Sequence, residues 1–191
     1  MLVVKFGGTS VGSTRAISRV IEIIKDKKHA GKTQVAVISA FSGVTDDLID
    51  ISQKAASGES YREKLNDLAE RHRKTAAFFL KKDRRKTVFS DIDRQFKELE
   101  KILDGITMLR ELSLRSLDLA MSFGERLSAS VLTHIFINEG IPAAYLDAST
   151  LIKTNDNFGN ADYIPGETYK NIKEFFSPKN SKWKNNKNTQ A

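Results

Sequence analysis

The chain has 191 residues, of which 40% are hydrophobic and 29% are charged, and its formal net charge is +7. This length and composition are typical of a globular protein with one domain and a real core. The absence of cysteine excludes disulfides and thiolate metal sites. No apolar stretch reaches the ~20 residues that span a bilayer, and the N-terminus has no leader pattern, so we expect a cytoplasmic protein with no membrane partner.

The excess positive charge is concentrated at the C-terminal end. Residues 178–191 contain no acidic residue, and their four lysines account for +4 of the +7, which leaves +3 for the rest of the chain. Those lysines are Lys179, Lys182, Lys184 and Lys187. A second basic cluster, in residues 71–86, alternates with acidic side chains at helical spacing, which is typical of a solvated helix face. We therefore expect no nucleic-acid partner.

The N-terminus predicts a strand followed by a glycine turn. Residues 2–6 form a short apolar run, LVVKF, that is typical of a fully buried parallel strand. Lys5 is unusual there because a buried ammonium is costly unless an anion meets it. Two glycines follow the strand, and then two good helix-capping residues, Thr9 and Ser10.

This order of strand, glycine turn and helix start predicts a phosphate cradle. The glycines allow close approach of the backbone, and the amides and the helix dipole favour an anion, while Lys5 would supply charge for a β- or γ-phosphate. The alternative is an ordinary turn whose lysine reaches solvent. No Gly-Lys-Ser/Thr follows, which excludes the Walker pattern, and the spacing of Gly7, Gly8 and Gly12 excludes the dinucleotide fingerprint.

The next segments predict a parallel sheet. Isoleucine and valine recur at helical spacing over residues 13–29, and residues 34–40 form a second apolar run typical of a buried strand. Strand, helix and strand in this order make a βαβ unit. Ligands bind beyond the carboxyl ends of such strands, which points to the turn 7–10 and to the segment 39–45.

A long helical insertion follows. Residues 46–119 are rich in Lys, Arg, Glu and Leu, and the expected breaks are at Gly58 and near Gly105. We expect two or three antiparallel helices at one end of the sheet. The three histidines fall on predicted helices and are interpreted as surface or packing residues: His29, His72 and His134.

The C-terminal part predicts a return to the sheet. A helix is predicted over 120–139, where Gly124 near the start costs about 1 kcal/mol relative to alanine and so indicates a close approach to the backbone. A third strand is predicted over 143–146, a polar loop over 149–161 and a helix over 166–176.

Several strings in this order resemble one known family. Residues 5–11, KFGGTSV, closely resemble the opening signature of the aspartate kinases, which belong to the amino-acid kinase superfamily. Residues 39–45 (SAFSGVT) and 122–128 (SFGERLS) resemble its second-strand loop and its helix-start motif, and residues 154–161 match a loop near the substrate more weakly. The resemblance implies an α/β fold with a three-layer parallel sheet of the carbamate-kinase type, and residues 1–177 would be its N-terminal portion.

The resemblance also implies an activity and a site. The family transfers phosphate from ATP, with Mg²⁺, to the side-chain carboxylate of L-aspartate, giving 4-phospho-L-aspartate at the head of lysine, threonine and methionine synthesis. Lys5 would be catalytic, and the nucleotide would be bound by Lys5, Gly7, Gly8, Thr9 and Ser10. The substrate would be bound by Ser39, Thr45 and Glu125, with Thr45 at a carboxylate and Glu125 at the ammonium. No metal ligand in the chain itself is predicted.

These implied roles are physically consistent. A carboxylate that attacks ATP brings two anions together, so the reaction needs positioning and charge neutralisation, and no proton has to be removed. Lys5 and the turn amides can stabilise the transferring group, and Mg²⁺ would bridge the phosphates. Structural roles are the alternative for two residues: Glu125 could complement a helix dipole, and Thr45 could cap the next helix.

The chain departs from the resemblance at its end. Family members are much longer, full-length relatives are expected to be homo-oligomers, and some carry a homoserine dehydrogenase domain. Residues 178–191 are rich in Lys and Asn and can bury little except Trp183, which predicts a disordered, non-native tail from a frameshift or early stop; a natural short protein with a basic tail is the alternative. A sheet cut after its third strand would leave an apolar face uncovered, so we expect low activity and aggregation.

Two further hypotheses compete with the aspartate kinase. A related amino-acid kinase could act on glutamate, acetylglutamate, carbamate or a nucleotide, although residues 9–11 and the helical insertion argue against it. A non-catalytic protein could instead bind phosphate or nucleic acid through the basic tail, and its binding would weaken steeply with salt.

Overall fold

The computed structural model describes residues 1–26 and 34–177, in two compact units. The first is Met1–Ile141 and the second begins at Pro142. The end of the predicted helix 13–29, His29 and the lysine-rich tail lie outside the described residues.

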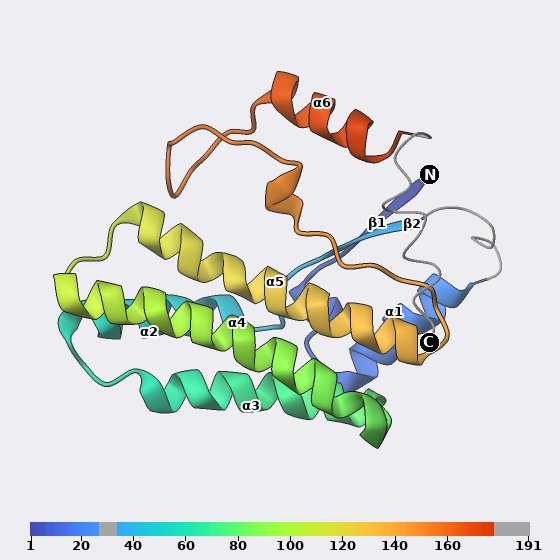
Figure 1. The fold of residues 1–191 in the computed structure, drawn as a ribbon, viewed down its shortest axis with the longest axis horizontal. Coiled ribbons are helices and arrows are strands. Elements are labelled where there is room, and N and C mark those ends of the chain that lie inside the picture. The colour runs from blue at the N-terminus through green and yellow to red at the C-terminus, as the bar shows by residue number, and fades with distance from the viewer. Residues whose placement is uncertain (27–33, 178–191) are drawn as a thin grey trace. The chain divides into compact units, whose positions relative to one another are not determined.

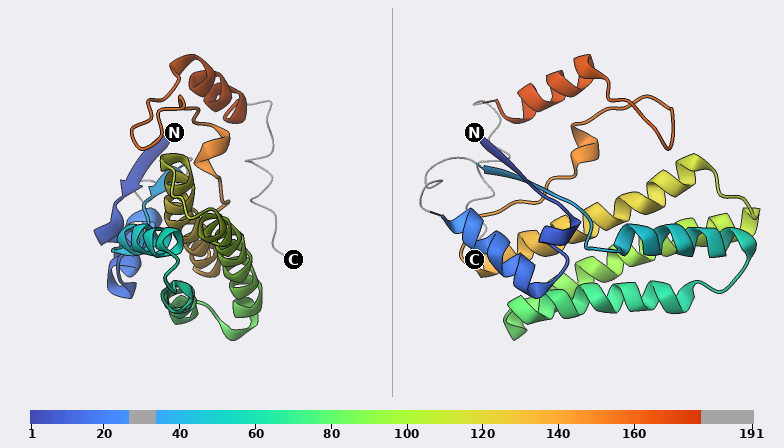
Figure 2. Two further views of the ribbon diagram at one scale, coloured as in Figure 1. Left: turned by 90° about the vertical axis from the view of Figure 1, so that its left-hand side faces the viewer. Right: turned by 180° about the vertical axis from the view of Figure 1, so that it is seen from behind.

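The first unit contains the predicted parallel βαβ unit. Strands β1 (Leu2–Phe6) and β2 (Gln34–Ile38) pair in parallel, with Leu2 opposite Gln34 and Phe6 opposite Ile38. Helix α1 (Thr14–Lys25) lies between them in the sequence. The strands run side by side in Figure 1 and Figure 2. The shared direction brings both carboxyl ends to one edge of the sheet.

The strands are only half buried, which corrects the expectation of full burial. Val3 is 57% exposed and Val37 is 46% exposed, and Lys5 lies on the same face. The opposite face is covered, since Phe6 is 7% exposed. A parallel sheet is buried on both sides only when layers cover both faces. The exposed valines show that, among the described residues, no layer covers one face of the sheet.

Four helices form the core of the first unit. They are α2 (Val44–Ser57), α3 (Arg62–Phe79), α4 (Lys82–Leu109) and α5 (Leu114–Asn138). Figure 1 and Figure 2 show them packed alongside one another, which confirms the helical insertion. Their facing stripes supply the fully buried side chains, among them Leu48, Ile51, Leu99, Leu103, Leu127 and Leu132.

The helix boundaries differ from the prediction at two places. Gly58 ends α2 in the left-handed region, with φ 77°, as expected. Gly105, however, lies inside α4, and the chain turns instead at Arg110, whose φ is 55°. The Arg110 guanidinium donates to the carbonyl of Ser57 over 2.6 Å, which ties this turn to the end of α2. One glycine lowers helix stability by about 1 kcal/mol, and the packing of the long helix α4 more than compensates for this loss.

Helix α5 begins earlier than predicted, so Gly124 lies in its interior rather than at its start. The hydroxyl of Ser113 caps α5 by accepting from the amide of Ser116. The predicted close approach at Gly124 is confirmed, because a Cβ there would lie 2.9 Å from the Cβ of Ala40 and 3.5 Å from Leu48 Cδ1. Glycine therefore lets α5 pack directly against the end of β2 and against α2.

His72 is a buried packing residue, as predicted. Its ring stacks on Phe41, with centroids 5.0 Å apart, and meets the edge of Phe96 at 5.6 Å. Its Nδ1 lies 2.7 Å from the carbonyl of Leu68, to which a neutral ring donates, whereas Nε2 is buried with no hydrogen-bond partner among the described residues. Burial lowers the pKa of His72 to about 4, so the ring is neutral at pH 7.

The second unit has little regular structure. A 3-10 turn, η3 (Ala148–Thr150), leads to an isolated bridge between Thr154 and Tyr163, and helix α6 (Pro165–Phe175) follows. The predicted third strand over 143–146 is wrong, because the described part of the sheet contains only β1 and β2. A strand needs a partner for its backbone groups, which sequence periodicity does not supply. No described helix is long and apolar enough to cross a bilayer.

The contact at Gly124 predicts opposite effects of two glycine-to-alanine changes. Gly124→Ala should lower the free energy of unfolding by about 1–3 kcal/mol, because the new methyl group would press on Ala40. Gly105→Ala is the matched control, since a Cβ there meets nothing within 4 Å, and it should raise stability by up to about 1 kcal/mol. Urea unfolding followed by circular dichroism measures both. Equal effects in the two variants would contradict the close packing.

The burial of His72 predicts a pH-dependent stability. Its folded pKa of about 4 is below the ordinary histidine pKa of 6.5, so the unfolded chain binds more protons between these values and stability falls as the pH is lowered. This group should cost about 2 kcal/mol between pH 7 and pH 5. His72→Phe lacks the titrating ring but keeps every carboxylate, so urea unfolding at both pH values should show a smaller loss for the variant. Parallel losses would contradict the assignment.

Candidate functional site

The two segments predicted to bind ligands meet at the carboxyl edge of the sheet. The amide of Ser39 donates to the carbonyl of Phe6 over 3.1 Å, which extends the strand pairing into the loop that follows β2. Next to it, a Cβ on Gly8 would lie 3.3 Å from the carbonyl oxygen of Ala40. The glycine turn 7–10 and the loop 39–45, here called the substrate loop, are therefore in contact.

The glycine turn is a short 3-10 helix rather than the first turn of α1. In η1 (Gly8–Ser10), the amide of Ser10 donates to the carbonyl of Gly7 over 2.9 Å. The first amides of such a turn have no intrahelical acceptor and can donate to an anion. Thr9 and Ser10 do not cap α1, which corrects the expectation. Ser13 does, because its hydroxyl accepts from the amide of Ala16 over 3.2 Å.

Gly12, which the sequence argument did not assign to the site, is the most crowded glycine of this region. A Cβ on it would lie 2.8 Å from the Cβ of Ser42 and 3.0 Å from the carbonyl oxygen of Gly8. A Cβ on Gly7 would meet nothing within 4 Å. Gly12 thus presses the end of the turn against the substrate loop. The sequence feature that could have identified Gly12 as part of the site is its position directly after the string KFGGTSV.

The Lys5 ammonium has no counter-ion within the part of the chain that the structure describes. It is exposed on the open face of β1, opposite Val37 in the register. The expectation that Lys5 is buried, and needs an anion for that reason, is therefore wrong. Its ammonium forms no hydrogen bond or ion pair within the described part of the chain. A phosphate could therefore bind Lys5 without breaking an ion pair.

Glu125 reaches the substrate loop from α5. Its Oε1 accepts from the amide of Ala40 over 3.2 Å, and the side chain remains exposed. One turn later, the hydroxyl of Ser128 donates to the carbonyl of Ser39 over 2.7 Å. Glu125 lies in the interior of α5, which excludes its alternative role at a helix N-terminus. The carboxylate thus holds the loop and still has an oxygen for a ligand.

Thr45 lies at the start of α2 but does not cap it. The N-cap is Gly43, whose φ of 78° lies in the left-handed region that favours glycine. Thr45 is the second residue of the helix and half-buried, and its hydroxyl has no partner among the residues that the structure describes. Its alternative role as a cap is excluded, and the hydroxyl is available to a ligand.

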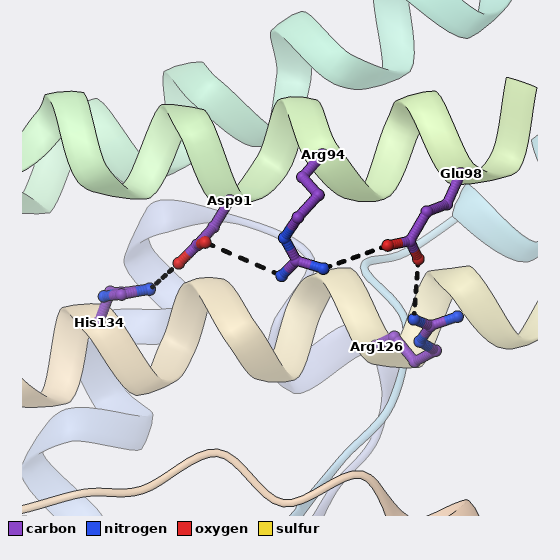
Figure 3. A network of polar contacts seen from close by, with 5 residues as sticks. All are labelled: Asp91, Arg94, Glu98, Arg126 and His134. Carbon is purple, nitrogen blue, oxygen red and sulfur yellow. Dashed lines mark hydrogen bonds and ion pairs between the residues drawn. The ribbon is translucent and has the colours of Figure 1, made fainter.

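A polar network fixes α5 against α4 beside the site. Figure 3 shows its members: Asp91, Arg94, Glu98, Arg126 and His134. Glu98 lies 3.2 Å from both arginines, and the Asp91 carboxylate lies 3.0 Å from the His134 ring. Each partly exposed pair contributes at most about 1 kcal/mol. Their combined geometry fixes the rotation of α5, and so the direction in which the neighbouring Glu125 points.

The basic cluster of α3 is largely paired with acidic side chains. Arg73 contacts Asp93 of α4 at 2.5 Å and Glu70 at 3.5 Å, and Lys74 lies 4.0 Å from Glu70. This confirms the interpretation as a face of mixed charge. Among the described residues, no group of three or more His, Asp or Glu side chains could hold a metal ion, so no metal ligands are assigned.

The weaker fourth string, residues 154–161, lies in the second unit. The Asn155 side-chain oxygen accepts from the amides of Asn157 and Asp162, over 3.2 and 3.1 Å, so the loop is ordered by its own hydrogen bonds. Its role near a substrate stays a prediction.

The chain matches the model of the amino acid kinase family over residues 1–181 and belongs to that family. Among curated relatives it is 31% identical, over 180 residues, to a bifunctional aspartokinase/homoserine dehydrogenase 2 of Arabidopsis thaliana, covering 93% of this chain and 19% of the relative. It is 34% identical to aspartokinase 1 of the same plant, over 85% of this chain and 28% of the relative. With the lysine-sensitive aspartokinase 3 of Escherichia coli the identity is 28%, over 85% of this chain and 34% of the relative.

Solved structures confirm the fold. Aspartokinase III of E. coli, in complex with aspartate and ADP, superposes with a TM-score of 0.79 at 23% identity, over 93% of this chain and 38% of that one. The aspartate kinase of Clostridium acetobutylicum gives a TM-score of 0.65 at 19% identity, over 91% of this chain and 36% of that one. The expected α/β amino-acid kinase fold is therefore correct, and the chain spans between 19% and 38% of the length of the relatives named here.

The crowding at Gly12 predicts which glycine of the turn resists substitution. Gly12→Ala should lower the free energy of unfolding by about 1–3 kcal/mol, because its methyl group would overlap Ser42. Gly7→Ala is the control, since Gly7 has open space and a φ of −74° that alanine adopts, and it should change stability by less than about 0.5 kcal/mol. Adding Ser42→Gly to Gly12→Ala should recover part of the loss in urea unfolding. The reverse ranking of the two glycines would contradict the packing.

Proposed function

We propose that this chain carries the phosphate turn and the aspartate pocket of an ATP-dependent aspartate kinase, with residues 1–177 as the N-terminal part of its catalytic domain. The convergence on Ala40 supports the proposal most strongly: the glycine turn packs on its carbonyl, and Glu125 accepts from its amide. The substrate loop joins these two groups. The relatives named aspartokinases favour aspartate over the substrates of other amino-acid kinases.

The nucleotide would be held at its phosphate end. The first amides of η1 donate to phosphate oxygens, and the ammonium of Lys5, which has no ion pair among the described residues, adds a full positive charge. The charge on the transferring group grows as its bond to ADP breaks, so donors fixed in advance stabilise the transition state. Mg²⁺, bound to phosphate oxygens rather than to a cluster in this part of the chain, would neutralise the remaining charge.

The aspartate would be held by the substrate loop and α5. The exposed carboxylate of Glu125 suits the α-ammonium, and the hydroxyls of Thr45 and Ser39 suit a carboxylate. The side-chain carboxylate of aspartate then attacks the γ-phosphorus, the bond to the β–γ bridging oxygen breaks, and ADP leaves. The nucleophile is already ionised at pH 7, so no general base is required. The product is 4-phospho-L-aspartate, a precursor suited to lysine and threonine synthesis.

Binding measurements on the chain separate the two halves of this proposal. Lys5→Ala should weaken binding of Mg-ATP about 10- to 100-fold, since a contact between charged groups is lost. Lys101→Ala, which removes an exposed lysine from α4, is the charge-matched control and should bind as the wild type does. Glu125→Gln should weaken L-aspartate binding similarly, because its amide oxygen can still accept from Ala40 but has no charge for an ammonium.

Isothermal titration calorimetry with Mg-ATP, L-aspartate and L-glutamate gives these constants. The proposal expects aspartate to bind and glutamate to bind much more weakly. A wild-type chain that binds neither Mg-ATP nor aspartate, or a Lys5→Ala variant that binds ATP unchanged, would contradict it.

A further inference from the structure

Two consecutive residues of α3 contact two consecutive residues of the substrate loop. The Arg71 guanidinium donates from Nη2 to the carbonyl of Ser42 over 2.7 Å. The ring of His72 stacks on Phe41, with the ring planes 20° apart. One contact fixes the backbone of the loop and the other fixes a side chain, so the two together restrain both the position and the rotation of this segment.

Arg71 uses its guanidinium on a backbone carbonyl instead of a carboxylate. It forms no ion pair within the described residues, although Asp67 and Glu70 of the same helix line the same open groove of about 480 Å³. The carbonyl it contacts belongs to Ser42, the residue against which Gly12 packs. Arg71 therefore acts on the point where the substrate loop touches the end of the glycine turn.

His72 anchors Phe41 in the helical core. Phe41 is 2% exposed and His72 is fully buried, and Phe96 of α4 meets the His72 ring in an edge-on contact. A neutral ring is required here, because a buried charge without a counter-ion is costly. The stack therefore holds the loop as a packed aromatic contact and contributes no charge to the site.

The contacts from α3 complete those from α5. Ser128 holds the carbonyl of Ser39, and Glu125 holds the amide of Ala40. Every residue from 39 to 42 is thus restrained by α3 of the insertion or by α5, which follows it, immediately before Gly43 turns the chain toward Thr45.

We propose that Arg71 and His72 are positioning residues: through them the helical insertion sets the geometry of the substrate loop, and hence the affinity for the amino-acid substrate. Neither residue touches the reacting atoms. The role in substrate affinity rests on the proposed function above, whereas the role in ordering the loop does not.

Hydrogen exchange at single amides, measured by NMR on the whole chain without ligand, tests the ordering of the loop. The probes are the amides of Ala40 and Val44, which donate to Glu125 and to the carbonyl of Phe41, and the buried helical residues Leu99 and Leu103 report on α4. Arg71→Met should speed exchange at the loop probes at least about tenfold and leave α4 unchanged, because a hydrogen bond from a charged donor is lost. Lys74→Met, which removes one charge from the exposed side of the same helix, should change neither.

The stacking contact has its own pair of variants. His72→Leu removes the aromatic face and should also speed exchange at the loop, whereas His72→Phe keeps that face and should restore slow exchange. If His72→Leu does not fold, Arg71→Met still decides the ordering of the loop, because Arg71 is only partly buried and its replacement leaves the helical core intact. Unchanged loop exchange in Arg71→Met, equal acceleration at the loop and in α4, or fast exchange in a folded His72→Phe would each overturn the proposal.

Calorimetry with L-aspartate separates this proposal from the proposed function. Arg71→Met should weaken aspartate binding at least about fivefold, while Lys74→Met binds as the wild type does. If the wild type binds no aspartate, the proposed function fails and the exchange data still decide the ordering of the loop. If the wild type binds aspartate and Arg71→Met binds it equally well, the positioning role in substrate affinity fails and the proposed function stands.

Discussion

The close packing around Ala40 is the constraint on which the site depends. A Cβ at position 124 would lie 2.9 Å from the side chain of Ala40, a Cβ on Gly8 would lie 3.3 Å from its carbonyl oxygen, and its amide donates to Glu125. Small residues on both sides allow β2, the glycine turn and α5 to meet at one point. A glycine in the interior of α5 lowers the stability of that helix, but Gly124 allows the close packing of α5 against Ala40.

The helical insertion supports this junction without supplying the phosphate turn. The network between α4 and α5 (Figure 3) fixes the rotation of α5. Glu125, next to Arg126 in that helix, accepts from the amide of Ala40 in the substrate loop. Helix α3 contacts the same loop through Arg71 and His72. Binding groups are most precise when packed helices restrain them, because each restrained residue has fewer conformations to lose on binding. The long helical insertion therefore serves to hold the short substrate loop in place.

For Lys5, the sequence predicted the strand correctly but predicted the burial of the side chain wrongly. The sequence indicated a buried strand whose lysine needed an anion. The structure has the strand, but it leaves Lys5 on an exposed face together with Val3 and Val37. The cation is available because it has no ion pair within the described residues, and not because burial penalises it. Strand formation follows from the local run of apolar residues, whereas burial needs a second layer.

The sequence by itself determined the order and type of most elements, the glycine turn, the loop after β2 and the string around Glu125. These follow from local apolar periodicity and turn residues, which act over a few positions. Only the tertiary structure decided that α4 continues through Gly105, that Ser13 caps α1 and that residues 143–146 form no strand. The course of α4 and the missing strand depend on packing or pairing with residues distant in the chain, and such contacts outweigh local preferences of about 1 kcal/mol. The Ser13 cap is a local contact with Ala16, but it forms there because the glycine turn closes as a separate 3-10 helix.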